Sequence, residues 1–227
     1  MSNKGLLTRH VIVMFSSLAL IVLFWLSRLD WDPEMRLWRA VGDTSWILLC
    51  ISLVVGPLSR LWKPSTYLMV WRREIGIWFG LLAFTHALLI LNGWVRWDVM
   101  RFLGYEFVPE LGRLARLEPG FGLANAIGLV ALIWALLLTP TSSDWALKRL
   151  GGGGWKWLHS GAYVIFYLVA LHTFYFLFVH YSLSFHRPVP PNPNWLSTPF
   201  MALTLSVPLL QSIAFVKTVS ERKRAKG

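Results

Sequence analysis

Three histidines, His86, His159 and His172, lie inside long apolar stretches that carry few other ionisable groups. Ionisable side chains are rare in the hydrocarbon layer of a membrane because burying them is costly, so each marks a candidate functional site. Neutral imidazoles on facing helices are suitable axial ligands for a haem iron. The only cysteine is Cys50, so this chain alone cannot build a disulfide, a thiolate zinc site, an iron–sulfur cluster or a c-type haem attachment. Histidines are therefore the candidate ligands for a metal in this chain.

The composition predicts an all-α polytopic membrane protein. Of the 227 residues 56% are hydrophobic, with 14 Trp and 14 Phe, and the mean hydropathy is +0.53. Six apolar runs have about the 20 residues that cross a bilayer as a helix, at roughly residues 10–27, 42–59, 74–95, 120–140, 157–180 and 197–216. We expect a single transmembrane domain over residues 1–227 that is a bundle of six helices.

Two of these spans admit another interpretation. The second is interrupted by Gly56 and Pro57. The first follows Lys4 and Arg9 and could be a signal peptide, but its apolar run ends without a small-residue cleavage pattern. We expect the first span to remain in the protein.

The distribution of charge predicts the orientation. The net charge is +11. The two termini and the second and fourth loops hold 14 Lys and Arg and 3 acidic residues, whereas the other three loops hold 8 of each kind. The positive-inside rule then places both termini in the cytoplasm. The basic tail, residues 217–227, is better explained as an orientation signal that touches anionic lipid than as a nucleic-acid arm.

The depths of the histidines can be compared by counting residues. The third and fifth helices both start at the predicted cytoplasmic face. His86 follows Arg72 by 14 residues and His172 follows His159 by 13, about 21 and 20 Å along a helix. His86 and His172 should therefore lie at one level, which predicts a haem between the third and fifth helices. His159 should lie level with Arg72 and Arg73.

Simpler explanations stay open for parts of this pattern. Small residues beside His86, such as Gly76 and Gly80, would make room for a macrocycle, but such residues also let helices pack closely without a cofactor. His159 points about 140° away from His172 on an ideal helix and lies beside interfacial Trp and Lys residues, so it is either a ligand or an interfacial residue. Arg72 or Arg73 would be its partner or a propionate counter-charge. The remaining histidines are interpreted as interfacial: His10, His180 and His186.

Several motifs resemble the ferric-reductase-like transmembrane family. The run Trp71-Arg72-Arg73-Glu74-Ile75-Gly76 before His86 is similar to its RR-x-x-G…H helix, and Trp155-Lys156-Trp157-Leu158-His159 before His172 to its W-x-x-LH…H helix. The likeness covers about residues 42–180, and within the family it is strongest to short haem-binding membrane subunits that serve a methionine sulfoxide reductase. Two outer loops depart from that pattern, the long loop 96–118 and a proline-rich loop after residue 187.

The resemblance implies an electron-transfer subunit of an oxidoreductase system. It implies haem b, in one or two copies, held by His86, His159 and His172, with FMN as a further cofactor and Arg72 or Arg73 at the site. The donor would be a cytoplasmic flavin reductase or quinol, and the acceptor a periplasmic oxidoreductase across the bacterial inner membrane. An outward-acting ferric or metal reductase is the alternative in the same family.

The residues themselves restrict the remaining function classes. Gly151 to Gly154 lack the Lys and Ser/Thr of a P-loop, and no dinucleotide fingerprint is present, so we expect no NAD(P)H domain in this chain. Electrons must then arrive from another molecule, through an inner relay that is a second haem or a flavin near His159. A transporter is disfavoured because the sequence shows no internal repeat and no Asp or Glu in a confident span core. A cofactor-free scaffold would leave the matched histidines unexplained.

Overall fold

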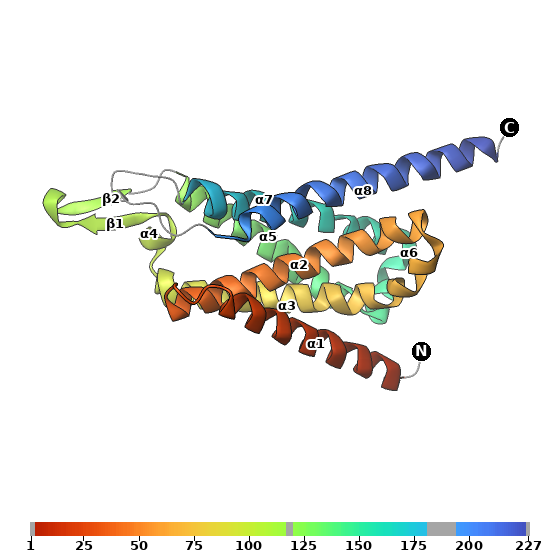
Figure 1. The fold of residues 1–227 in the computed structure, drawn as a ribbon, viewed down its shortest axis with the longest axis horizontal. Coiled ribbons are helices and arrows are strands. Elements are labelled where there is room, and N and C mark those ends of the chain that lie inside the picture. The colour runs from red at the N-terminus through yellow and green to blue at the C-terminus, as the bar shows by residue number, and fades with distance from the viewer. Residues whose placement is uncertain (1–2, 117–119, 181–193, 226–227) are drawn as a thin grey trace.

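The computed structural model describes residues 3–116, 120–180 and 194–225 as a bundle of long helices (Figure 1). Six helical segments are long and apolar enough to cross a membrane, so the predicted number of spans is confirmed. The long helices are α1 (Asn3–Leu26), α2 (Pro33–Leu61), α3 (Arg72–Ile90), α5 (Phe121–Thr141), α6 (Asp144–Ser160), α7 (Ala162–Phe174) and α8 (Ser197–Arg224). A 3-10 helix, Lys63–Trp71, links α2 to α3, and π-helical turns, Leu91–Val95 and Tyr175–Val179, extend α3 and α7.

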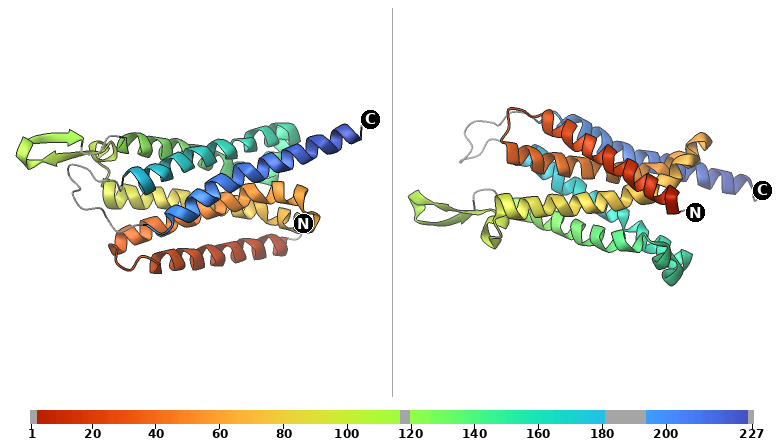
Figure 2. Two further views of the ribbon diagram at one scale, coloured as in Figure 1. Left: turned by 45° about the horizontal axis from the view of Figure 1, so that its top comes forward. Right: turned by 90° about the horizontal axis from the view of Figure 1, so that it is seen from below.

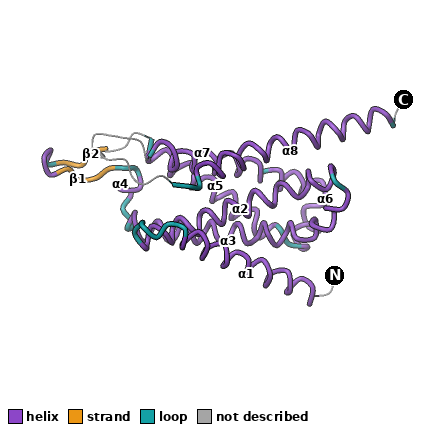
Figure 3. Tube along the Cα trace, in the orientation of Figure 1, coloured by secondary structure: helices purple, strands orange, loops and turns teal. Residues whose placement is uncertain are grey.

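Both termini lie at one end of the bundle, and a small β-hairpin projects beyond the other end (Figures 1 and 2). The hairpin pairs β1 (Tyr105–Val108) with β2 (Arg113–Arg116) in antiparallel fashion, after the short helix α4 (Val99–Phe102) and around a 3-10 turn, Pro109–Leu111. It is the strand pair of Figure 3 and an addition to the all-α prediction, built from the long outer loop.

The central helix is α2, and it is longer than the predicted span 42–59. Its apolar window is 61% buried, against at most 33% for the other five spans. The helix starts early because Asp32 accepts hydrogen bonds from the backbone N–H groups of Glu34 and Met35, and Pro33 occupies the first turn, where its missing N–H is not needed.

The extended start of α2 brings charged groups into the bundle. Asp43 is 7% exposed and pairs with the equally buried Arg28, whose guanidinium nitrogen lies 2.6 Å from the carboxylate. At the other end of the bundle, Glu74 is 1% exposed and pairs with Arg9 of α1. The two carboxylates lie within the first two residues of the predicted spans 42–59 and 74–95, outside the span cores that were expected to hold no Asp or Glu. Arginine partners replace part of the water that these carboxylates would lose, and Oε2 of Glu74 is left without a hydrogen-bond partner among the described residues.

The fifth span runs from Asp144 to Val179 and contains two breaks. Inside α6, Gly151 has φ +68° and ψ 160°, a conformation open essentially to glycine alone. The second break is the single residue Gly161 between α6 and α7, whose φ of −57° and ψ of −17° stay near helical values. The glycine run Gly151 to Gly154 is thus part of a kinked helix, and α7, which carries His172, begins at Ala162.

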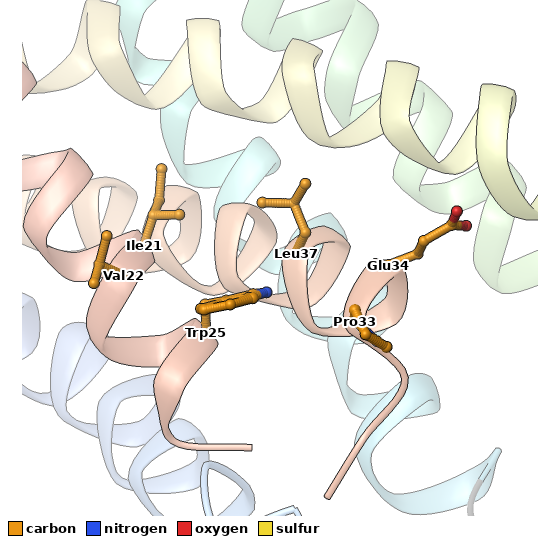
Figure 4. Close-up of a pocket in the computed structure, with 6 residues that line it drawn as sticks. All are labelled: Ile21, Val22, Trp25, Pro33, Glu34 and Leu37. Carbon is orange, nitrogen blue, oxygen red and sulfur yellow. The ribbon is translucent and has the colours of Figure 1, made fainter. Parts of the chain in front are cut away.

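A shallow apolar groove lies between the end of α1 and the start of α2, with a volume of about 390 Å³. Figure 4 shows the six side chains that line it: Ile21, Val22, Trp25, Pro33, Glu34 and Leu37. None of the predicted site residues lines this groove, so the candidate site is sought among the histidines.

Candidate functional site

His86 of α3 and His172 of α7 are each fixed by one hydrogen bond to a neighbouring helix. Nδ1 of His86 lies 2.9 Å from the carbonyl oxygen of Trp38, in α2. Nδ1 of His172 lies 2.8 Å from the carbonyl oxygen of Ala124, in α5. Because a carbonyl oxygen only accepts, Nδ1 is the protonated nitrogen in both rings and donates the bond. The lone pair of each imidazole is then on Nε2, as in most metal-ligating histidines.

The helices that carry these contacts form a ring of four. Helix α2 packs against α3, α3 against α5, α5 against α7, and α7 against α2. His86 and His172 therefore stand on diagonally opposite helices, and they are close enough to interact electrostatically. Both side chains are half-buried, and within the described part of the chain neither Nε2 has a hydrogen-bond partner. The ring thus presents two free imidazole nitrogens from opposite sides.

This donor set fits a haem better than a bare metal ion. Among residues 3–116, 120–180 and 194–225 no group of three or more His, Cys, Asp or Glu side chains is placed to hold a metal. Two imidazoles suffice for a haem because the porphyrin supplies the other four nitrogen ligands. His86 and His172 are therefore the residues that could hold the group, and their tautomers are already those required for ligation.

Arg39 adds a positive charge at this level of the bundle. It lies on α2 one residue beyond Trp38 and interacts electrostatically with both His86 and His172. Its guanidinium donates to the carbonyl oxygen of Phe176 and lies 5.8 Å from that residue's ring centroid. The Phe176 ring is in turn 5.0 Å from the imidazole of His172. A cation in this position can balance a haem propionate or added electron charge.

His159 lies at the other level, in a different environment. Its Nε2 is 3.3 Å from the hydroxyl of Thr141, and its ring stacks on Trp155 at 4.1 Å. The indole of Trp155 donates to the Thr141 carbonyl oxygen, which ties α6 to the end of α5. Nε2, which has no hydrogen-bond partner among the described residues in His86 and His172, thus contacts the Thr141 hydroxyl in His159. His159 therefore lacks the available Nε2 lone pair that the other two histidines offer to an iron.

The structure separates the two candidate arginines. Arg72 donates to the carbonyl oxygen of Ser52, inside the bundle, and interacts electrostatically with His159. Arg73 forms a 2.8 Å ion pair with Asp144 in which the two side chains are 34% and 80% exposed. Only Arg72 is therefore brought together with His159.

Of the other described histidines, His10 lies away from the ligand pair, whereas His180, like His172, contacts the Phe176 ring. His10 is half-buried on α1, outside the four-helix ring. His180 packs among aromatic rings at the end of the π-helical turn, 5.4 Å from Phe121 and 5.5 Å from Phe176. His186 lies outside the described residues.

Sequence reasoning missed the residues that hold the imidazoles. Trp38 and Ala124 are far from the histidines along the chain, and they act through backbone carbonyls that any residue type has. One signal was available: the separation between each accepting carbonyl and its histidine is 48 residues in both cases. Helices α2 with α3 and α5 with α7 share one arrangement, in which a carbonyl oxygen of the first helix accepts from a histidine of the second.

The chain belongs to the ferric reductase like transmembrane component family, which matches residues 41–170. That range contains His86 and His159 and ends two residues before His172. With six candidate spans, the chain is a multi-pass membrane protein of this family.

Two of its relatives are heme-binding subunits MsrQ of a protein-methionine-sulfoxide reductase. The chain is 31% identical to that of Herminiimonas arsenicoxydans, over 74% of this chain and 70% of the relative. It is 30% identical to that of Ralstonia nicotianae, over 68% of this chain and 65% of the relative. The magnetosome protein MamZ of Paramagnetospirillum magneticum is 35% identical over 59% of this chain but only 19% of its own length. The similarity to the MsrQ proteins thus extends over most of their length, whereas the similarity to MamZ is confined to a small part of that longer protein.

Proposed function

We propose that this chain is a b-type haem membrane protein that passes electrons across the bacterial inner membrane. The observation that carries the proposal is the matched pair His86 and His172, held by the same type of hydrogen bond on opposite helices of the ring. The relatives named as heme-binding subunits support the same cofactor.

In this proposal His86 and His172 would hold the haem through the Nε2 atoms of their imidazoles, which have no hydrogen-bond partner within the described part of the ring of α2, α3, α5 and α7. The haem supplies one-electron redox chemistry when bound. The protein's own residues orient the ligands: the Trp38 and Ala124 carbonyls fix the imidazole tautomers and rotations. Arg39 contributes a compensating positive charge.

The orientation proposed from the basic residues places both termini in the cytoplasm. His86 then lies about 21 Å from the cytoplasmic boundary of a hydrocarbon layer about 30 Å thick. The outer haem is therefore near the periplasmic side, where the hairpin of β1 and β2 would meet the acceptor. By analogy with the relatives we propose that the acceptor is a periplasmic methionine sulfoxide reductase and that the donor is a cytoplasmic flavin reductase or quinol.

The wide cytoplasmic gap calls for an inner relay at the level of His159. We propose that this relay is a second haem or FMN, held beside His159 and Arg72. Arg72 is the arginine assigned to it because the guanidinium is anchored inside the bundle, whereas Arg73 pairs with an exposed carboxylate. A haem on His159 would require its imidazole to leave Thr141; a flavin would not.

A second candidate function is an outward-acting ferric or metal reductase. The family description itself favours it. Purified protein with reduced haem would discriminate the two: rapid reoxidation by a chelated ferric salt supports a metal reductase, whereas reoxidation only by a methionine sulfoxide reductase supports the electron-transfer subunit.

The proposal is tested by measuring haem in purified wild-type protein and in His86→Ala, His172→Ala and His159→Ala, with His10→Ala as the control. We expect a low-spin b-type spectrum in the wild type, loss of the outer haem in His86→Ala and in His172→Ala alike, an unchanged spectrum in His10→Ala, and retention of the outer haem in His159→Ala. Equal loss follows because the two ligands share one iron. A wild-type protein that binds no haem, or an unchanged spectrum in both ligand variants, would refute the outer site.

The inner relay is tested on protein in vesicles, with the rate of haem reduction by reduced flavin added on the cytoplasmic side as the readout. Arg72→Ala and His159→Ala should slow this reduction, while Arg73→Ala should leave it unchanged. Electron transfer at the full rate with a single bound cofactor, after reconstitution with ample haem and FMN, would contradict the relay.

A further inference from the structure

Two glycines lie directly against the two ligand imidazoles. A Cβ atom built on Gly42 of α2 would lie 3.0 Å from both Cε1 and Nδ1 of His86. A Cβ built on Gly128 of α5 would lie 2.6 Å from Nδ1 and 2.8 Å from Cε1 of His172. At each position all three nearest atoms belong to the imidazole, so each ring rests on the backbone of the opposing helix.

The glycine and the hydrogen-bond acceptor of each imidazole are on the same helix, one turn apart. Gly42 follows Trp38 by four residues, and Gly128 follows Ala124 by four. Residues four apart share a helix face, so the carbonyl oxygen and the bare glycine backbone contact one ring together. The ring atoms nearest each glycine are Nδ1, Cε1 and Cγ, which leaves Nε2 on the edge away from that helix.

The two units also agree in register. Gly42 precedes His86 by 44 residues, and Gly128 precedes His172 by the same number. Generic close packing of helices does not require a glycine at this place in both pairs. On α3 itself, a Cβ built on Gly76 would have no neighbour within 4 Å, and a Cβ on Gly80 would overlap Thr139 rather than a histidine.

We propose that Gly42 and Gly128 are positioning residues for the two ligand histidines, each providing a flat backbone surface that sets the tilt of one imidazole and the direction of its Nε2. This inference rests on the proposed function and deepens it. A methyl group on Gly128 requires a shift, because real Cβ atoms essentially never approach a neighbour within 3.0 Å. The shift would move the ring of His172 off the Ala124 carbonyl oxygen.

The test compares Gly128→Ala and Gly42→Ala with two matched controls. Gly5→Ala adds a methyl group in open space on α1, outside the ring of four helices, and Gly80→Ala disturbs the contact between α3 and α5 without touching an imidazole. The readouts are haem affinity, the fraction of high-spin iron by electron paramagnetic resonance, and binding of carbon monoxide to the reduced protein. The last two report an axial ligand that has been displaced, which a loss of packing alone would not produce.

We expect Gly128→Ala to weaken haem binding by about tenfold or more, which is the lower end of the loss in metal affinity seen when a group that orients a metal ligand is removed. The variant should also contain a fraction of high-spin haem that binds carbon monoxide. Gly42→Ala should show the same change to a smaller extent, because its contact is longer, and it serves as the test if Gly128→Ala does not fold. Gly80→Ala should lower thermal stability while its bound haem stays low-spin.

The outcomes separate this inference from the proposed function. A wild-type protein without haem refutes the function itself. Wild-type low-spin haem together with unchanged spectra and affinity in the folded glycine variants refutes the positioning role alone. High-spin iron in Gly5→Ala or Gly80→Ala to the same degree would also overturn it, because the effect would then not depend on contact with the imidazole.

Discussion

The buried ion pair between Arg28 and Asp43 should be the most sensitive charged contact in the described part of the protein. Its side chains are 2% and 8% exposed, and the two atoms lie 2.6 Å apart. Arg28 also donates to Asn194, just before α8, and its guanidinium lies within 6 Å of the rings of Trp31 and Trp195. The pair thus joins the segment between α1 and α2, the start of α2 and the start of α8.

Asp43→Asn removes one charge and leaves the other buried without a counter-ion. Breaking a buried pair in this way costs about 3–5 kcal/mol, whereas an exposed pair contributes about 0–1 kcal/mol. For a chain of this size 1 kcal/mol corresponds to roughly 2–4 °C in the unfolding temperature. A loss of about 3 kcal/mol then predicts a decrease of roughly 6–12 °C.

Thermal unfolding in one detergent, followed by intrinsic Trp fluorescence, provides the assay. Arg73→Ala is the matched control, since its pair with Asp144 has a similar distance of 2.8 Å but exposed side chains. The double variant Arg28→Met with Asp43→Leu should recover most of the loss, because no buried charge remains unpaired. If Asp43→Asn decreases the unfolding temperature no more than Arg73→Ala does, the reasoning from burial is refuted.

Two further predictions concern the site and the kink. Arg39→Met should lower the haem midpoint potential by roughly 30–60 mV, because loss of a cation near the ligands disfavours electron gain. Redox titration measures this, with Arg113→Met in the hairpin as the control. Equal midpoint potentials in the two variants would contradict the prediction. Gly151→Ala should lower the free energy of unfolding by about 1–3 kcal/mol, since a φ of +68° and a ψ of 160° strain any other residue. Gly152→Ala, at a helical position, should raise it by up to about 1 kcal/mol. Thermal unfolding of both variants is the measurement, and equal unfolding temperatures would refute the strain at Gly151.

The sequence predicted the features that depend on local periodicity and length. The six spans follow from the thickness of a bilayer and the rise of a helix, and those constants hold in any fold. The same constants predicted that His86 and His172 lie at one level, a prediction that their mutual electrostatic interaction supports. Charge patterning predicted that both termini lie at one end of the bundle, as Figure 1 shows, although the side of the membrane stays a prediction.

The start of α2 and the outer hairpin were missed for a different reason. A local apolar pattern stops at charged residues, so the predicted second span started at residue 42 and left out Arg36 and Arg39. The structure accommodates these two residues because Arg36 donates to the Trp25 carbonyl oxygen and Arg39 donates to the Phe176 carbonyl oxygen. Such partners come from distant segments and are invisible to a local pattern.

By itself, the sequence determined which residues could act and at what depth, because residue type and helical rise are properties of each segment alone. Only the tertiary structure decided that α3 and α7 stand diagonally in a ring of four, and that Arg72 rather than Arg73 lies with His159. It also decided that each imidazole rests on a glycine and a carbonyl oxygen of another helix. These contacts join residues 44 and 48 positions apart, and they depend on how helices pack, which no single segment encodes.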